Sequence, residues 1–266
     1  MKEFILECYK EYVKFIDIGN NILPGINPIS QNSNNQNNDK SSYAYIDDGE
    51  IGNNPINLYY SQMLCDCHKT FQKAVLFHEF THICDETIFL SIYDKKELSS
   101  IMAIYSEYHA AQIELACKAG FRNIHACYKM NLSKTFVYSE NKKIKIETDY
   151  TYPASDALII IEQPKDKYYN LDNYNYFLCY KTFEAKTMYY LGKRKFCEKY
   201  SLKKIPDLTS TWYGDFYPYV QKLEECILNK NFKELILARK RLFEKFFSTF
   251  SFCNLPGLLN EVSFYS

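Results

Sequence analysis

The feature that most constrains this chain is the run His78-Glu79-Phe80-Thr81-His82. Two histidines four residues apart on an α-helix differ by about 40° in direction, so both imidazoles point to one side. Such a pair can chelate one zinc ion, with about 2.0–2.1 Å between the metal and each nitrogen. Glu79 is then placed to accept a proton from a metal-bound water, as a general base. The run therefore predicts a metal-binding helix and a further ligand brought to it by the fold.

A catalytic zinc ion normally has three protein ligands and one open position. The long signature with a third histidine six residues after His82 is excluded, because position 88 is isoleucine. A carboxylate from a following helix is the usual alternative, and Glu107 is the third ligand that we predict. Two other side chains of the same segment remain as alternatives, His109 and Glu114.

Small residues accompany the predicted ligand. Ala110 and Ala111 lie between Glu107 and Glu114 on one helical face, where they would let a neighbouring helix approach closely. Metal-bound histidines usually donate their second N–H to a carboxylate or a carbonyl. Asp85, three residues after His82, is a candidate for that role, and an acidic side chain that contacts only water is the competing interpretation.

The composition narrows the class of protein. The chain has 266 residues, 47% of them hydrophobic, which suits one large domain or two small ones. With 32 basic and 32 acidic residues, it has no net charge that would draw it to nucleic acid or to an anionic membrane. The one basic, aromatic-rich segment is Lys193–Lys204, which we interpret as a solvated helix face. A surface that binds nucleic acid or a partner is the alternative for this segment.

The cysteines and the N-terminus point to the cytoplasm. Charges interrupt the apolar residues of the first helix, so no secretory segment is predicted, and no run is long enough to span a membrane. Ten cysteines at irregular spacing fit reduced thiols. The cluster Cys65-Asp66-Cys67-His68 lacks the second Cys/His pair that structural zinc requires, so we expect no metal there.

The pattern of apolar residues predicts a mixed fold that ends in helices. We expect helices over about 2–17, 67–84, 96–119, 181–200, 211–229 and 232–250, and extended segments at 43–46, 56–60, 143–148 and 157–162. No linker composition marks a domain boundary. The division that we predict is a metal-binding domain over 1–130 and a mixed, then helical, region of unknown role over 131–266.

The segment Phe77–His82 together with Glu107-x-x-Ala110 resembles the ImmA/IrrE-type zinc peptidases, which are small gluzincin-like proteins often carried by mobile elements. The resemblance covers about residues 1–120. It implies an α+β, zincin-like core made of a helix, a small sheet, a metal-binding helix and a glutamate helix. It also implies cleavage of a cytoplasmic partner protein, commonly a DNA-binding repressor. The larger gluzincins have an acidic residue four positions after the ligand glutamate, whereas this chain has Ala111.

The predicted function is therefore that of a zinc metallopeptidase. His78, His82 and Glu107 are its expected zinc ligands, Glu79 is its base, and a protein or peptide is its substrate. The alternative is a non-catalytic, zinc-containing interaction protein whose C-terminal helices bind a partner.

Overall fold

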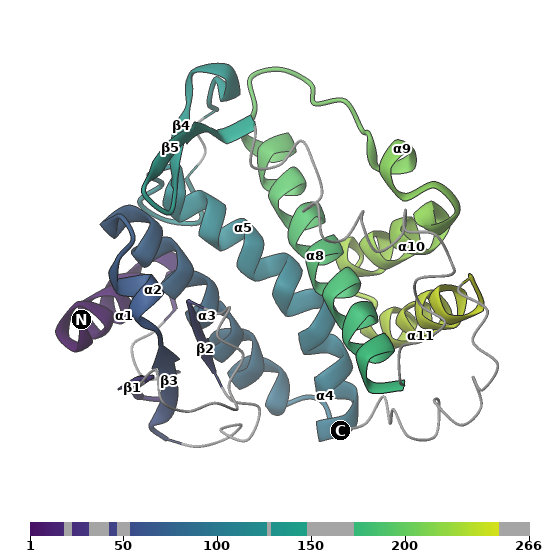
Figure 1. Ribbon diagram of the computed structural model, residues 1–266, viewed down its shortest axis with the longest axis horizontal. Coiled ribbons are helices and arrows are strands. Elements are labelled where there is room, and N and C mark those ends of the chain that lie inside the picture. Colours follow the sequence, from purple (N-terminus) through teal and green to yellow (C-terminus); the bar gives the residue numbers. More distant parts are fainter. Residues whose placement is uncertain (19–22, 32–42, 47–53, 127–128, 148–172, 250–266) are drawn as a thin grey trace.

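The computed structural model describes residues 1–18, 23–31, 43–46, 54–126, 129–147 and 173–249. These residues form a mostly helical α+β structure with a small sheet at one side, as the sequence predicts (Figure 1). None of the helices described has the length and apolar character needed to cross a bilayer. The expected extended segment at 157–162 lies outside the described residues.

The N-terminal part holds one helix and a three-stranded sheet. Helix α1 spans Lys2–Ile16, and the strands are β1 (Ile26–Ser30), β2 (Ala44–Ile46) and β3 (Ile56–Tyr60). The sheet order is β1-β3-β2, with β1 parallel and β2 antiparallel to β3. Strand β1 was not predicted, because its Asn27 and Pro28 are poor strand formers. The hydrogen bonds of its pairing with β3 stabilise the strand, although the local sequence has a low strand propensity.

The middle of the chain forms the helices that hold the predicted site. After the short helix α2 (Gln62–Cys65), α3 runs over Lys69–Leu90, six residues beyond the predicted end. The predicted second helix is present as three joined elements, α4 (Lys95–Ile101), the π-helical turn η2 (Met102–Ser106) and α5 (Glu107–Lys118). In Figure 1, α5 lies between α3 and the later helix α8, and it packs against both.

The rest of the described chain is a hairpin followed by helices. A short turn of helix, η3 (Leu132–Lys134), precedes the antiparallel strands β4 (Phe136–Ser139) and β5 (Lys142–Lys145). The helical elements that follow are α8 (Asn173–Tyr200), α9 (Thr209–Tyr213), η5 (Gly214–Phe216), α10 (Tyr217–Leu228) and α11 (Phe232–Thr249). Helices thus occupy the three predicted C-terminal ranges, and α8 begins eight residues before the predicted start. The range 211–229, predicted as one helix, is divided among α9, η5 and α10.

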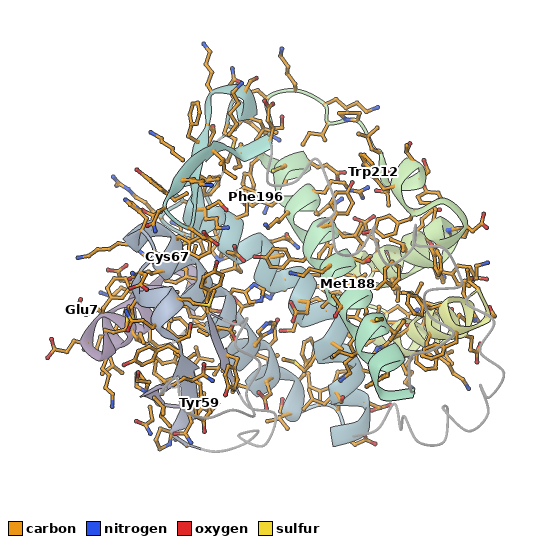
Figure 2. The ribbon with its side chains drawn as sticks, viewed as in Figure 1. Glu7, Tyr59, Cys67, Met188, Phe196 and Trp212 are labelled. Carbon is orange, nitrogen blue, oxygen red and sulfur yellow. The ribbon has the colours of Figure 1, made fainter. Side chains whose placement is uncertain are left out.

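Two large groups of buried apolar side chains share the helices α5 and α8. The first group joins α1, the sheet and α3 to Ile113 of α5 and Phe196 of α8. The second joins Tyr108 of α5 and Met188 of α8 to α10 and α11. Figure 2 labels Met188 and Phe196 on the same helix. A boundary at residue 130 stays a prediction, although the two apolar groups meet along these shared helices.

Helix α3 is fixed from one side by aromatic residues of α1. The ring of Tyr12 meets those of Phe77 and Phe80 edge-on, at 5.4 Å and 5.6 Å between centroids. Its hydroxyl donates to Oγ1 of Thr81 at 3.2 Å. These contacts occupy one side of α3, and His78 and His82 face Glu107 of the neighbouring α5.

Helices α5 and α8 cross at unusually short range. A Cβ atom on Gly192 of α8 would lie 2.2 Å from the carbonyl oxygen of Tyr108 and 3.0 Å from Cβ of Ala111. Only glycine fits at this point. The small residue Ala111, expected to ease the approach of a neighbour, therefore faces α8 at the crossing.

Candidate metal centre

Three side chains from two helices converge as the sequence predicts. Nε2 of His78 lies 3.5 Å from Oε2 of Glu107, and Nε2 of His82 lies 3.7 Å from Oε1 of the same carboxylate. One ligand atom from each residue falls within 4.8 Å of the others. All three side chains are mostly buried, with Glu107 the most exposed at 28%. The described residues hold one such group, and it can bind a metal ion.

Both imidazoles turn the same nitrogen towards Glu107. Nδ1 of His82 is hydrogen-bonded to Oγ of Ser106 at 2.8 Å. Nδ1 of His78 lies 3.3 Å from Oε2 of Glu114, in an ion-pair contact that lacks the alignment of a hydrogen bond. These partners favour a proton on each Nδ1, which leaves Nε2 free to bind a metal.

The glutamate ligand enters the site from the end of the π-helical turn. Ser106 is the last residue of η2 and Glu107 is the first of α5. A π-helical turn contains more residues than an α-helical one, so it changes the direction in which the following side chains point. Here two consecutive residues reach the same histidine, one at each ring nitrogen.

Electrostatics in the metal-free site reflect the mixture of carboxylates and imidazoles. Burial disfavours the charged form of His78, but its contacts with Glu107 and Glu114 outweigh burial and raise its pKa to about 10. Burial lowers the pKa of His82 to about 4. Burial raises the pKa of Glu79 to about 8; His78 opposes this shift and the nearby carboxylates add to it. At neutral pH the imidazole of His78 is thus protonated on both nitrogens, and a metal ion would displace the proton on Nε2.

Glu114 is not one of the three candidate ligands, but its carboxylate contacts Nδ1 of one of them, His78. Its carboxylate is buried, and Nζ of Lys118 lies 2.6 Å from Oε1. The hydroxyl of Tyr189, from α8, donates to Oε2. Burial favours the neutral acid, but Lys118 and the other cations nearby outweigh it and lower the pKa of Glu114. Helical spacing placed Glu114 near the site, whereas nothing in the sequence pointed to Tyr189.

Asp85 has a different partner from the one expected. Its two carboxylate oxygens lie 2.9 Å and 3.1 Å from Nδ1 of His109, and no hydrogen bond joins it to His78 or His82 in the described part of the chain. The histidine support proposed for Asp85 is therefore supplied by Glu114 and Ser106. His109 accordingly lies outside the ligand group.

The Cys65–His68 cluster lies just before α3, and His68 caps the N-terminus of this helix. Nδ1 of His68 accepts a hydrogen bond from the N–H of Thr70 at 3.2 Å, as an N-cap. Its ring stacks on that of Tyr138 with 3.6 Å between centroids. Sγ of Cys67 donates to the carbonyl of Met63. His68 and Cys67 thus have local partners at the start of α3.

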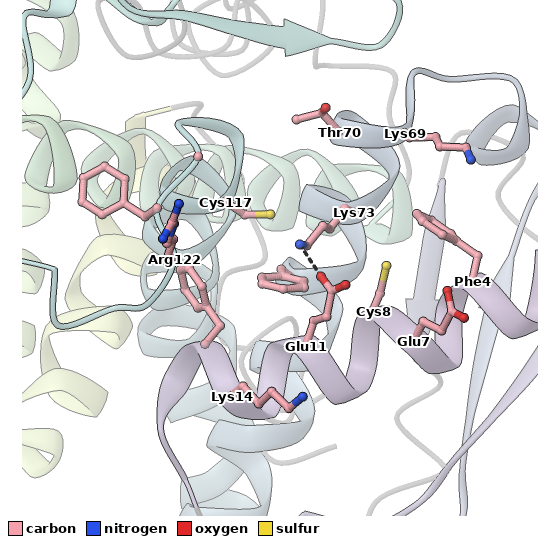
Figure 3. A pocket seen from close by; sticks show the side chains of 14 residues that line it. Phe4, Glu7, Cys8, Glu11, Lys14, Lys69, Thr70, Lys73, Cys117 and Arg122 are labelled. Carbon is pink, nitrogen blue, oxygen red and sulfur yellow. Dashed lines mark ion pairs between the residues drawn. The ribbon is translucent and has the colours of Figure 1, made fainter.

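A pocket of about 620 Å³ lies between α1, the start of α3 and the end of α5 (Figure 3). His78, His82 and Glu107 do not line it. An ion pair between Lys73 and Glu11 crosses it. Two thiols line it, those of Cys8 and Cys117, and burial raises the pKa of each to about 12. Because both thiols stay protonated at neutral pH, the pocket offers no thiolate nucleophile.

The basic segment Lys193–Lys204 is a solvated face only in part, because Lys199, Lys203 and Lys204 are exposed but its start is not. Lys193 and Arg194 are buried. The guanidinium of Arg194 pairs with Glu224 at 2.7 Å and with Asp207 at 2.6 Å, tying α8 to α10 and to the segment before α9. The start of this segment therefore joins helices inside the protein.

Comparison of the chain with protein-family models, with curated proteins and with solved structures gives no match.

Proposed function

We propose that this protein is a zinc-dependent metallopeptidase that cleaves a protein or peptide in the cytoplasm. The observation that carries the proposal is the convergence of His78, His82 and Glu107, with Glu79 on the same helix. Two ligands at tetrahedral positions around zinc are about 3.4 Å apart. The separations of 3.5 Å and 3.7 Å between the histidine nitrogens and Glu107 are close to this value.

The set of donors also favours zinc among the common metals. Two imidazole nitrogens and one carboxylate form the ligand set of catalytic zinc in several peptidases. Calcium and magnesium prefer oxygen ligands alone. Three protein ligands leave one position for water, which is the arrangement of a catalytic rather than a structural zinc site.

The protein groups around the metal have separate tasks. When bound, zinc would acidify a water molecule and polarise the carbonyl of the peptide bond. Glu79 would accept the proton of that water and pass it to the leaving amine. Its pKa of about 8 describes the metal-free site. A divalent cation nearby favours the carboxylate, so Glu79 would be ionised at neutral pH in the metal-bound enzyme.

The resemblance to the ImmA/IrrE-type peptidases supports the same assignment and suggests a zincin-like arrangement of the helices and the small sheet. It further suggests a regulatory protein of a mobile element as the substrate. The non-catalytic alternative predicts a closed site with a fourth protein ligand. Glu114, a further buried carboxylate beside the site, instead contacts Nδ1 of His78 on the side away from Glu107.

Three variants test the proposal. Glu79→Gln should bind zinc like the wild type but lose hydrolysis of a fluorescence-quenched mixture of randomised peptides, and His78→Ala should lose both. Glu225→Gln, on the exposed surface of α10, is the matched control and should change neither. Equal turnover by Glu79→Gln and wild type would refute the role of Glu79. Failure of the zinc-loaded wild type to cleave any peptide of the mixture would favour the non-catalytic alternative.

A further inference from the structure

Helix α8, which comes after the β4–β5 hairpin in the chain, contributes a side chain to the candidate metal centre. The hydroxyl of Tyr189 donates to Oε2 of Glu114, the oxygen that faces Nδ1 of His78. The ring of Tyr189 lies 5.4 Å from the imidazole of His78, between centroids. We propose that Tyr189 is a positioning residue, which holds Glu114 in the orientation that directs Nε2 of His78 to the metal. The inference rests on the metal site of the proposed function.

Each oxygen of Glu114 has its own anchor. Lys118 fixes Oε1 from within α5, one turn further along. Tyr189 fixes Oε2 from the neighbouring helix. With Lys118 alone, the carboxylate could turn about its terminal bond and move Oε2 away from His78. Two anchors leave it one orientation.

His78 depends on that orientation because its Nδ1 has no aligned hydrogen-bond partner among the described residues. The contact of 3.3 Å with Glu114 is the one that can select the tautomer. His82, by contrast, has its own hydroxyl partner in Ser106. Loss of Tyr189 should therefore affect one histidine ligand and not the other.

Two contacts fix the position of Tyr189 itself. Gly192, three residues later on α8, meets the backbone of Tyr108 and brings the two helices to close range. The ammonium group of Lys193 lies 4.2 Å from the centre of the Tyr189 ring, in a cation–π contact. The tyrosine is thus held by its own helix before any metal binds.

The test uses the full-length protein freed of metal. Zinc affinity is measured by competition with a chromophoric chelator, and the ligand field is read from the visible spectrum of the cobalt-substituted protein. Tyr189→Phe should bind zinc about 10-fold more weakly, at the lower end of the 10–100-fold range for groups that support metal ligands. Its cobalt bands should also shift, because the orientation of one imidazole changes.

Tyr190→Phe is the matched control, on the same helix. The hydroxyl of Tyr190 faces Thr209 instead of the metal centre, and its side chain is buried. This variant removes a buried hydroxyl from α8, so it reports any general loosening of the helix. It should keep wild-type affinity and spectrum.

A double variant separates positioning from any independent effect. Glu114→Gln alone should weaken zinc binding about 10–100-fold. Adding Tyr189→Phe should then cause no further loss, because the tyrosine acts through Glu114. Wild-type affinity and spectrum in Tyr189→Phe, or additive losses in the double variant, would overturn the positioning role while leaving the metal site intact. If the wild type itself bound no zinc, the proposed function would fall, and this inference with it.

Discussion

The crossing of α5 and α8 makes a prediction that reverses a general rule about helices. Replacing glycine by alanine inside a helix usually stabilises a protein by about 0.8–1 kcal/mol, because glycine has more backbone freedom to lose. At Gly192 the added Cβ would lie 2.2 Å from the carbonyl oxygen of Tyr108, whereas ordinary contacts begin at 3.4 Å. Relief requires a separation of the helices by about 1 Å. We therefore expect Gly192→Ala to destabilise the protein.

The expected size follows from two opposing contributions. Crowding of a well-packed contact typically costs about 1–3 kcal/mol. The higher helix propensity of alanine offsets about 1 kcal/mol of this. The free energy of unfolding should thus fall by up to about 2 kcal/mol, as measured by urea denaturation of the metal-free protein. Because the separation also withdraws Tyr189 from Glu114, zinc affinity should fall about as far as in Tyr189→Phe.

The control is the same exchange at an exposed position of the same helix. Lys181 is exposed, so the Lys181→Ala variant should have a higher free energy of unfolding than Lys181→Gly. The difference should equal the ordinary difference in helix propensity between alanine and glycine. If Gly192→Ala stabilised the protein by about this propensity difference and left zinc affinity unchanged, α8 would not lie as close to α5 as described. The link between the crossing and the metal centre would then be refuted.

Three further predictions concern the site and its scaffold. Ser106→Ala should weaken zinc binding about 10-fold by removing the partner of His82, with competition against a chelator as the measurement. His78 has a pKa of about 10 without metal, above its ordinary 6.5, so its proton must leave when zinc binds. Zinc affinity should therefore rise as the pH rises towards 10. Calorimetry at pH 7 in two buffers should show release of close to two protons, one from His78 and one from Glu79, whose pKa of about 8 falls when a cation binds beside it. Arg239→Ala should lower the free energy of unfolding by about 3–5 kcal/mol, because it leaves the carboxylate of Glu184 buried without its partner; a loss below 1 kcal/mol in urea denaturation would contradict this.

The convergence of the three candidate ligands was predictable because it obeys local geometry. The direction of His78 and His82 follows from helical periodicity alone, and Glu107 could be chosen from a short segment of one following helix. Strand β1 was missed because pairing with β3 outweighs the weak strand propensity of Asn27 and Pro28. Such pairing depends on residues about thirty positions away, which a local pattern does not reveal.

The groups that support the ligands were harder to predict, for two physical reasons. Ser106 and Glu107 reach the same imidazole only because a π-helical turn ends there, and regular helical spacing would direct them to different sides. Tyr189 comes from a helix 75 residues after Glu114, placed by a contact between two backbones. Asp85 was assigned by its spacing from His82, yet it pairs with His109 on the neighbouring helix.

The π-helical turn Met102–Ser106 also determines which mutations this protein should tolerate. Upstream of it, Leu98 and Ile101 pack in an apolar group with Phe89, while Glu107 downstream must face the histidines. Regular α-helix through this segment would satisfy only one of these two requirements, since each residue adds about 100° of rotation. Exchanges of the half-buried side chains of Met102 and Ala103 should therefore be accepted far more readily than the loss of a single residue. Natural relatives of this protein should vary at these two positions while keeping the length of the segment.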